Sequence, residues 1–98
     1  MILVRDIFSL KFGKAKDAKV LLKEANDLNK NYGFDSTRAL TDLTGPSYTL
    51  VLESHWDSLA KWENSMKEGL GASDWQKWYQ KFVPLVDSAS REIFTVVD

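Results

Sequence analysis

The residues able to do acid–base or metal chemistry are few in this 98-residue chain. It has no cysteine, which excludes thiol nucleophiles, zinc–thiolate sites and iron–sulfur clusters. His55 is the single histidine, so a histidine-rich metal centre cannot form within one subunit, and we expect no metal and no cofactor. Glu53 lies two residues before His55, and this spacing puts both side chains on one face of a strand. The pair can in principle transfer protons, although a histidine near a strand end is more often a rim residue.

The four tryptophans are the other residues that invite a functional interpretation. Trp62, Trp75 and Trp78 recur at helical spacing among other apolar residues, whereas Trp56 ends a predicted strand. Helical spacing is more typical of core packing than of a stacking platform. Trp62 is still a candidate for the aromatic wall of a ligand site.

The composition predicts one globular domain over residues 1–98 and excludes several classes of protein. Hydrophobic residues make up 44% and charged residues 28%, which excludes a disordered chain. Thirteen Lys and Arg against fourteen Asp and Glu give a net charge of -1, unlike the basic surface of a nucleic-acid binder. No apolar run approaches the roughly 20 residues of a membrane helix, and charges begin at the fifth residue. We therefore expect no membrane segment, no signal peptide and a cytoplasmic location.

The elements that must position these residues begin with a strand over residues 2–12. Its even-numbered positions are apolar except Asp6, which interrupts that face. Gly13 ends the strand, and from residue 15 to about residue 32 apolar residues recur at three- and four-residue steps. This period predicts an amphipathic helix with Gly33 as its C-terminal cap. Residues 35–43 and 48–56 are predicted to form a hairpin around the Gly-Pro turn at residues 44–47.

A broken helical region and a last strand complete the chain. Asp57 or Ser58 is a plausible N-cap for the first helical piece, which glycines interrupt at positions 69 and 71. Its apolar stripe consists of Leu59, Trp62, Met66 and Leu70. Ser73 with Gln76 matches a capping box and opens a second helical piece, and residues 91–97 form the last strand. The order βαββαβ predicts an α+β, ferredoxin-like fold with an antiparallel four-stranded sheet and helices on one face.

The sheet face without helices is predicted to be apolar around a few charges. Odd-numbered strand positions are assigned to this face, and its apolar members are Leu3, Ile7, Val51, Ile93 and Val97. Soluble monomers rarely expose such a patch, so a two-fold dimer of facing sheets, which closes a barrel, is the simplest arrangement. The same face carries Arg5, Glu53 and His55. The first and third strands are neighbours in this fold, so Arg5 is expected near Glu53, as a structural ion pair or as part of a ligand site.

Three segments resemble those of dimeric α/β-barrel proteins and together span nearly the whole chain. LKFGKAKDAKVLLKEANDL is similar to the end of their first strand and the helix that follows. YTLVLESHWDSLAKWE is similar to their third strand and next helix. SDWQKWYQKFVPLVDSASREIF resembles the tryptophan-bearing helix and last strand of NIPSNAP-like members. The resemblance implies a homodimer in which each sheet closes the cavity of the other.

The resemblance implies little about chemistry, because the superfamily includes monooxygenases, isomerases, haem-degrading enzymes and proteins without an assigned activity. The monooxygenases of antibiotic biosynthesis act on hydroquinone-like aromatics without flavin or metal, and Trp62 occupies a place similar to their helical tryptophan. Their frequent first-strand asparagine is absent, since Arg5 and Asp6 stand there. Residues 74–82 contain no histidine, so haem ligation of the family type is not expected.

The leading hypothesis is a NIPSNAP-like homodimer that binds a small, largely apolar molecule in a cavity between sheet and helices. Arg5, Glu53 and His55 would orient polar groups of the ligand, and Trp62 would form an aromatic wall. One alternative is a cofactor-independent monooxygenase acting on a hydroquinone-like aromatic. The other is a structural dimer whose interior is filled by side chains and holds no ligand.

Overall fold

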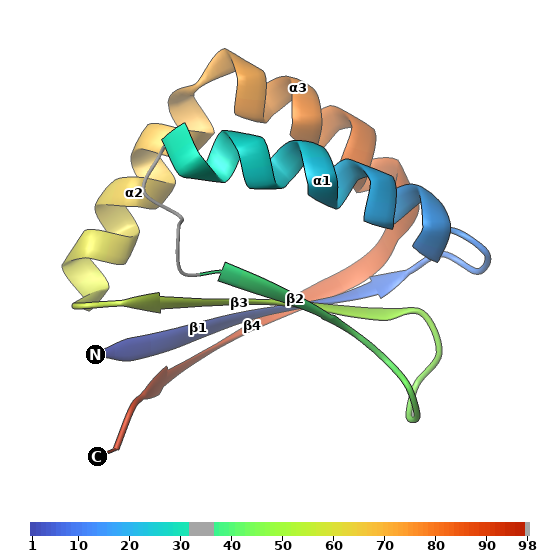
Figure 1. Ribbon diagram of the computed structural model, residues 1–98, viewed down its shortest axis with the longest axis horizontal. Helices are drawn as coiled ribbons and strands as arrows, with labels where there is room; N and C mark the ends of the chain where they lie inside the picture. Colours follow the sequence, from blue (N-terminus) through green and yellow to red (C-terminus); the bar gives the residue numbers. More distant parts are fainter. Residues whose placement is uncertain (32–36, 98) are drawn as a thin grey trace.

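The computed structural model describes residues 1–31 and 37–97, and Figure 1 shows the helices lying over one side of the sheet. The elements follow the predicted order, with the second helical region divided in two. They are β1 (Ile2–Leu10), α1 (Ala15–Asn31), β2 (Thr37–Thr41), β3 (Thr49–Trp56), α2 (Leu59–Gly71), α3 (Ser73–Phe82), the short 3₁₀ helix η1 (Val83–Leu85) and β4 (Val86–Thr95). No described helix is long and apolar enough to cross a membrane.

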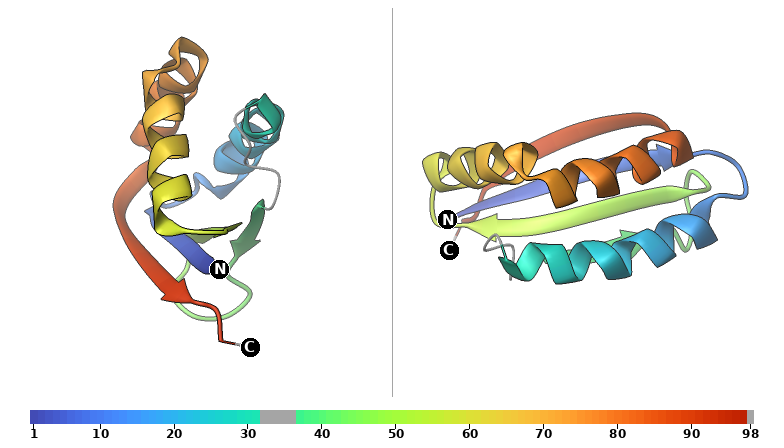
Figure 2. Two further views of the ribbon diagram at one scale, coloured as in Figure 1. Left: turned by 90° about the vertical axis from the view of Figure 1, so that its left-hand side faces the viewer. Right: turned by 90° about the horizontal axis from the view of Figure 1, so that it is seen from above.

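The strands form one antiparallel sheet in the order β2-β3-β1-β4. The helices cover one face of it, and no described element covers the other (Figures 1 and 2). The predicted α+β, ferredoxin-like fold is therefore confirmed. Figure 2 shows how α1 lies beside the pair formed by α2 and α3, so that the helical layer spans the sheet.

The first strand is shorter than the sequence predicts, because a tight turn begins earlier. Lys14 donates its backbone N–H to the Lys11 carbonyl at 3.0 Å, and Gly13 has a φ of 80°, a conformation that glycine adopts at little cost. Phe12 follows the end of β1 and is 88% exposed. The predicted helix end at Tyr32 and its cap at Gly33 lie outside the described residues.

The pairing of β4 with β1 corrects the prediction for the last strand. Odd-numbered residues of β1 and β3 share the helix-free face, as predicted, and Ile7 lies opposite Val51 there. In β4 the even-numbered residues lie on the helix-free face, because Leu3 pairs with Phe94 and Val4 with Ile93. The placement of Ile93 on the helix-free face is therefore wrong, and Phe94 lies there instead. Val97 follows the end of β4 and is 89% exposed.

The helix boundaries differ from the sequence prediction at one cap. Ser58 is the N-cap of α2, as predicted, and its hydroxyl accepts the Lys61 backbone N–H at 3.2 Å. The helix continues through Gly69 and ends at Gly71, before the extended residue Ala72, so the predicted interruption of the helical region is confirmed at Gly71. Ala72 is also the N-cap of α3 and makes no side-chain cap bond, so the predicted capping box at Ser73 is wrong. The side chain of Leu70 lies outside the described part of the structure.

The core joins α1 and α3 to the sheet, as the three- and four-residue spacing of apolar residues predicts. It consists of Leu10, Ala18, Leu21, Ala25, Leu50, Trp78 and Phe82. The ring of Phe82 stacks on Trp78 at a centroid distance of 4.9 Å and meets Phe8 edge-on at 5.0 Å. The Trp78 indole donates to the Leu21 carbonyl at 2.7 Å, which satisfies the one polar group of this buried ring.

Candidate functional site

A hollow of about 900 Å³ lies between the sheet and the helices, beside the core. Its floor includes Phe8 of β1 and Leu52 of β3, and its roof includes Met66 of α2. Trp62, Trp75 and Trp78 all contribute to its lining, which is mainly apolar. Cavities that bind drug-sized ligands have volumes of about 300–1,000 Å³ and are mostly apolar with a few convergent polar groups. The hollow therefore has the size and the lining of a small-molecule site.

One polar group stands out in this apolar lining, an ion pair between Asp6 of β1 and Arg91 of β4. The two residues are directly paired across the sheet, and the Arg91 Nε donates to Asp6 Oδ1. The Arg91 guanidinium also lies over the ring of Trp62, 5.1 Å from its centroid, in a cation–π contact. Both charged residues line the hollow, and the Asp6 side chain is only 26% exposed. The hollow thus offers a hydrogen-bond donor and an acceptor side by side.

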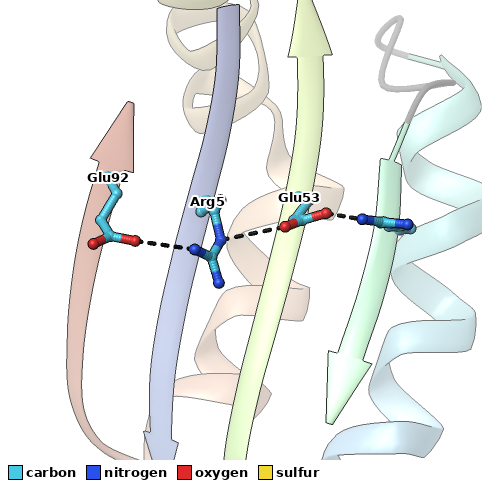
Figure 3. A network of polar contacts seen from close by, with 4 residues as sticks. Arg5, Glu53 and Glu92 are labelled. Carbon is cyan, nitrogen blue, oxygen red and sulfur yellow. Dashed lines mark hydrogen bonds and ion pairs between the residues drawn. The ribbon is translucent and has the colours of Figure 1, made fainter. Parts of the chain in front are cut away.

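A second set of charged side chains extends across the helix-free face of the sheet (Figure 3). Arg5 Nε lies 3.2 Å from Glu53 Oε2, and Arg38 Nε donates to Glu53 Oε1 at 2.7 Å. Arg5 also contacts Glu92 at 3.4 Å. These four residues, which we call the charged row, occupy one register line across β4, β1, β3 and β2. Their charges alternate, so each arginine compensates a neighbouring carboxylate.

The site residues predicted from the sequence are divided between the hollow and the helix-free face of the sheet. Trp62 lines the hollow, and Glu53 also borders it while facing its two arginines. Arg5 lies next to Glu53, as expected, but neither Arg5 nor His55 lines the hollow. His55 is exposed, and its backbone position pairs with Leu3 on the helix-free face. The structure thus brings Arg5 and Glu53 together and separates His55 from the hollow.

Sequence reasoning missed Asp6 and Arg91 as site residues. A signal for Asp6 existed, because it is the one charge among the apolar even-numbered positions of β1. No such signal existed for Arg91, whose face depends on how β4 pairs with β1. Among the described residues, no group of three or more His, Cys, Asp or Glu side chains could hold a metal ion. Within the hollow, the Asp6–Arg91 pair can hydrogen-bond a ligand and the aromatic rings can stack on one.

Comparison with known proteins finds likeness in structure and none in sequence. No protein-family model and no curated protein matches the chain. A NIPSNAP family protein from Agrobacterium tumefaciens strain C58 superposes with a TM-score of 0.89 at 16% identity, covering 99% of this chain and 93% of its own. An uncharacterized NIPSNAP-like domain protein from Burkholderia xenovorans has a TM-score of 0.89 at 14% identity, covering 98% and 84% of the two chains.

A weaker structural similarity links the chain to a second group of proteins with this fold. A protein from Nitrosomonas europaea, provisionally assigned as an antibiotic biosynthesis monooxygenase, has a TM-score of 0.76 at 11% identity over 100% of both chains. At these identities the comparisons establish the fold alone. The resemblance inferred from the sequence is confirmed at that level: this chain has the ferredoxin-like fold shared by NIPSNAP family proteins and antibiotic biosynthesis monooxygenases.

Proposed function

We propose that this NIPSNAP-like protein binds a small, largely apolar, aromatic molecule in the hollow between the sheet and the helices. The observation that carries the proposal is a volume of about 900 Å³ combined with a mainly apolar and aromatic lining that contains the Asp6–Arg91 donor–acceptor pair. An apolar ligand would gain from leaving water and from stacking on the rings. This volume favours ligand binding over the alternative in which side chains fill the interior, since that alternative expects no cavity of about 300 Å³ or more.

Trp62 provides the sharpest test of this location, because the chain offers a matched control. Trp62 lines the hollow and Trp56 does not, although both are half-buried. We expect native mass spectrometry of freshly purified protein to show a small-molecule adduct, which denaturation releases for identification. The Trp62→Ala variant should lose the adduct or weaken binding of the released compound at least fivefold, and Trp56→Ala should not. Equal retention by both variants would place the ligand elsewhere.

We further propose that the protein is a homodimer of facing sheets. The helix-free face carries apolar side chains on both sides of the charged row, including Leu3, Ile7 and Val51. The charged row is self-complementary about a two-fold axis parallel to the strands. Such an axis brings Glu92 of one copy opposite Arg38 of the other, and Arg5 opposite Glu53. A perpendicular axis in the same plane would instead bring like charges together, so the charge order favours one dimer geometry.

The dimer is tested by mass and by a charge placed on its proposed interface. We expect wild-type protein at micromolar concentration to have twice the mass of one chain in native mass spectrometry. Ile7→Asp adds an unpaired charge to the centre of the helix-free face and should give monomers. Leu59→Asp, at a position that is 47% exposed on α2, is the matched control and should remain dimeric. A monomeric wild type would contradict the proposed assembly.

A second candidate function is oxygenation of a hydroquinone-like aromatic without flavin or metal. The structural likeness to the Nitrosomonas europaea protein and the position of Trp62 beside a polar pair in the hollow favour it. It predicts oxygen consumption when the protein is mixed with a hydroquinone and no added cofactor. An absence of oxygen uptake above the autoxidation rate, across a panel of such compounds, would contradict this candidate and leave ligand binding unaffected.

A further inference from the structure

The Asp6–Arg91 pair can give the hollow a selectivity for the charge of its ligand, which its size and apolar lining do not provide. Arg91 is one of two arginines that line the hollow, and the other, Arg38, is paired with Glu53. In the described part of the chain, the partners of the Arg91 guanidinium are the Asp6 carboxylate, through Nε, and the face of Trp62. The Nη groups of Arg91 thus remain able to donate to a ligand, because only Nε is used in the contact with Asp6.

The charges that line the hollow compensate each other in pairs. Asp6 balances Arg91, and Glu53 balances Arg38. A ligand carboxylate bound to Arg91 would approach Asp6 as well, since these two side chains are in contact. The two carboxylates would repel each other, although water reduces the repulsion because Arg91 is 43% and Asp6 is 26% exposed. Both groups would also be acceptors with no proton to share. Asp6 therefore opposes the binding of anions at the arginine that would otherwise attract them.

A neutral amide is the chemical complement of the same pair. Its carbonyl can accept from an Nη of Arg91, and its N–H can donate to Asp6 Oδ2, which is not used in the contact with Nε. The aromatic part of such a ligand would lie against the apolar and aromatic lining. We infer that the hollow selects neutral aromatic molecules bearing an amide-like donor–acceptor group over the corresponding carboxylates, and that Asp6 sets this selectivity. The inference rests on the proposed function, because it names the class of ligand for the same hollow.

The test compares two ligands that share one ring system and differ in charge. We use 2-naphthamide and 2-naphthoate, titrated by calorimetry at pH 7.5, where the acid is ionised. Wild-type protein is expected to bind the amide at least tenfold more tightly than the carboxylate. Asp6→Asn removes the repelling charge and keeps an oxygen able to accept from Arg91 Nε. It should shrink that preference to threefold or less, or reverse it, mainly by strengthening carboxylate binding.

Two further variants separate local from general effects. Asp57→Asn makes the same change in net charge at a residue that does not line the hollow, so it should leave the tenfold preference intact. Arg91→Gln should weaken the amide about tenfold, and circular dichroism verifies that each variant is folded. Equal affinities of wild-type protein for the two ligands, or an equal effect of Asp57→Asn and Asp6→Asn, would overturn the inference while ligand binding stands. Failure of wild-type protein to bind either ligand would overturn the inference together with the proposed site.

Discussion

Replacing Glu53 with glutamine tests whether the charged row contributes to stability. The residue is 7% exposed, and it contacts Arg5 and Arg38 at 3.2 Å and 2.7 Å. Removing one partner of a fully buried ion pair costs about 3–5 kcal/mol, because a buried charge is left uncompensated. In the dissociated chain the side chains left behind are partly in water, since Arg5 is 33% and Arg38 is 69% exposed. We therefore expect Glu53→Gln to lower the free energy of unfolding by a smaller amount, about 1–3 kcal/mol.

Glu92 is the matched control for this experiment. It belongs to the same charged row, but its side chain is 45% exposed and lies 3.4 Å from Arg5. Exposed ion pairs contribute about 0–1 kcal/mol, so Glu92→Gln should change the stability of the dissociated chain by less than about 0.5 kcal/mol. Urea-induced unfolding of both variants is measured at two protein concentrations, because a dimer is more stable at the higher concentration. Equal midpoints for the two variants would refute the reasoning that burial, and not charge alone, sets the importance of Glu53.

Three further expectations follow from other parts of the molecule. Phe82→Ala removes a 2% exposed ring that stacks on Trp78, and should destabilise the fold by about 3–5 kcal/mol in the same urea assay; a loss below about 1 kcal/mol would contradict the described core. His55→Ala should leave affinity for a ligand of the hollow within twofold, and a fivefold loss by calorimetry would move the ligand to the helix-free face. A hydrogen bond from Lys61, followed by its charge, lowers the pKa of Asp57 below the ordinary value of 3.8. The stabilisation from this contact is thus fully present above pH 3.8 and is lost as the pH falls through the lowered pKa. Carbon-detected NMR titration should show that the pKa of Asp57 returns toward 3.8 in the Lys61→Met variant. An unchanged Asp57 titration in that variant would show that the contact does not form in solution.

The fold was largely predictable because its local patterns differ in period. Alternation in β1 and three- to four-residue steps in α1 distinguish strand from helix without tertiary information. The second strand of the hairpin, β3, was equally clear from its aromatic and β-branched residues. The start of β4 was not, because the small residues 88–90 carry no polar–apolar alternation and are held in the sheet by pairing with β1. The periodicity of residues within one segment does not predict which distant strand that segment pairs with.

The site was less predictable than the fold for the same reason. Arg5 and Glu53 could be brought together from the strand order alone, since both lie in strands with clear alternation. Arg91 is 85 residues from Asp6, and a shift of one residue in the pairing of β4 would turn it to the opposite face. The interruption of the apolar face at Asp6 was visible, but its partner was not. The hollow itself depends on how far the helices stand from the sheet, which no sequence pattern specifies.

The location of the ligand is tested most directly by the indole N–H signals of the tryptophans. Trp62, Trp75 and Trp78 line the hollow, whereas Trp56 does not and donates its indole N–H to Ser54 at 2.8 Å. In ¹⁵N-labelled protein titrated with 2-naphthamide, we expect the signals of the three lining indoles to shift in proportion to occupancy. The Trp56 signal should stay in place. Saturable shifts of the His55 imidazole and the Arg5 guanidinium, with the three indoles unmoved, would contradict a ligand site between the sheet and the helices.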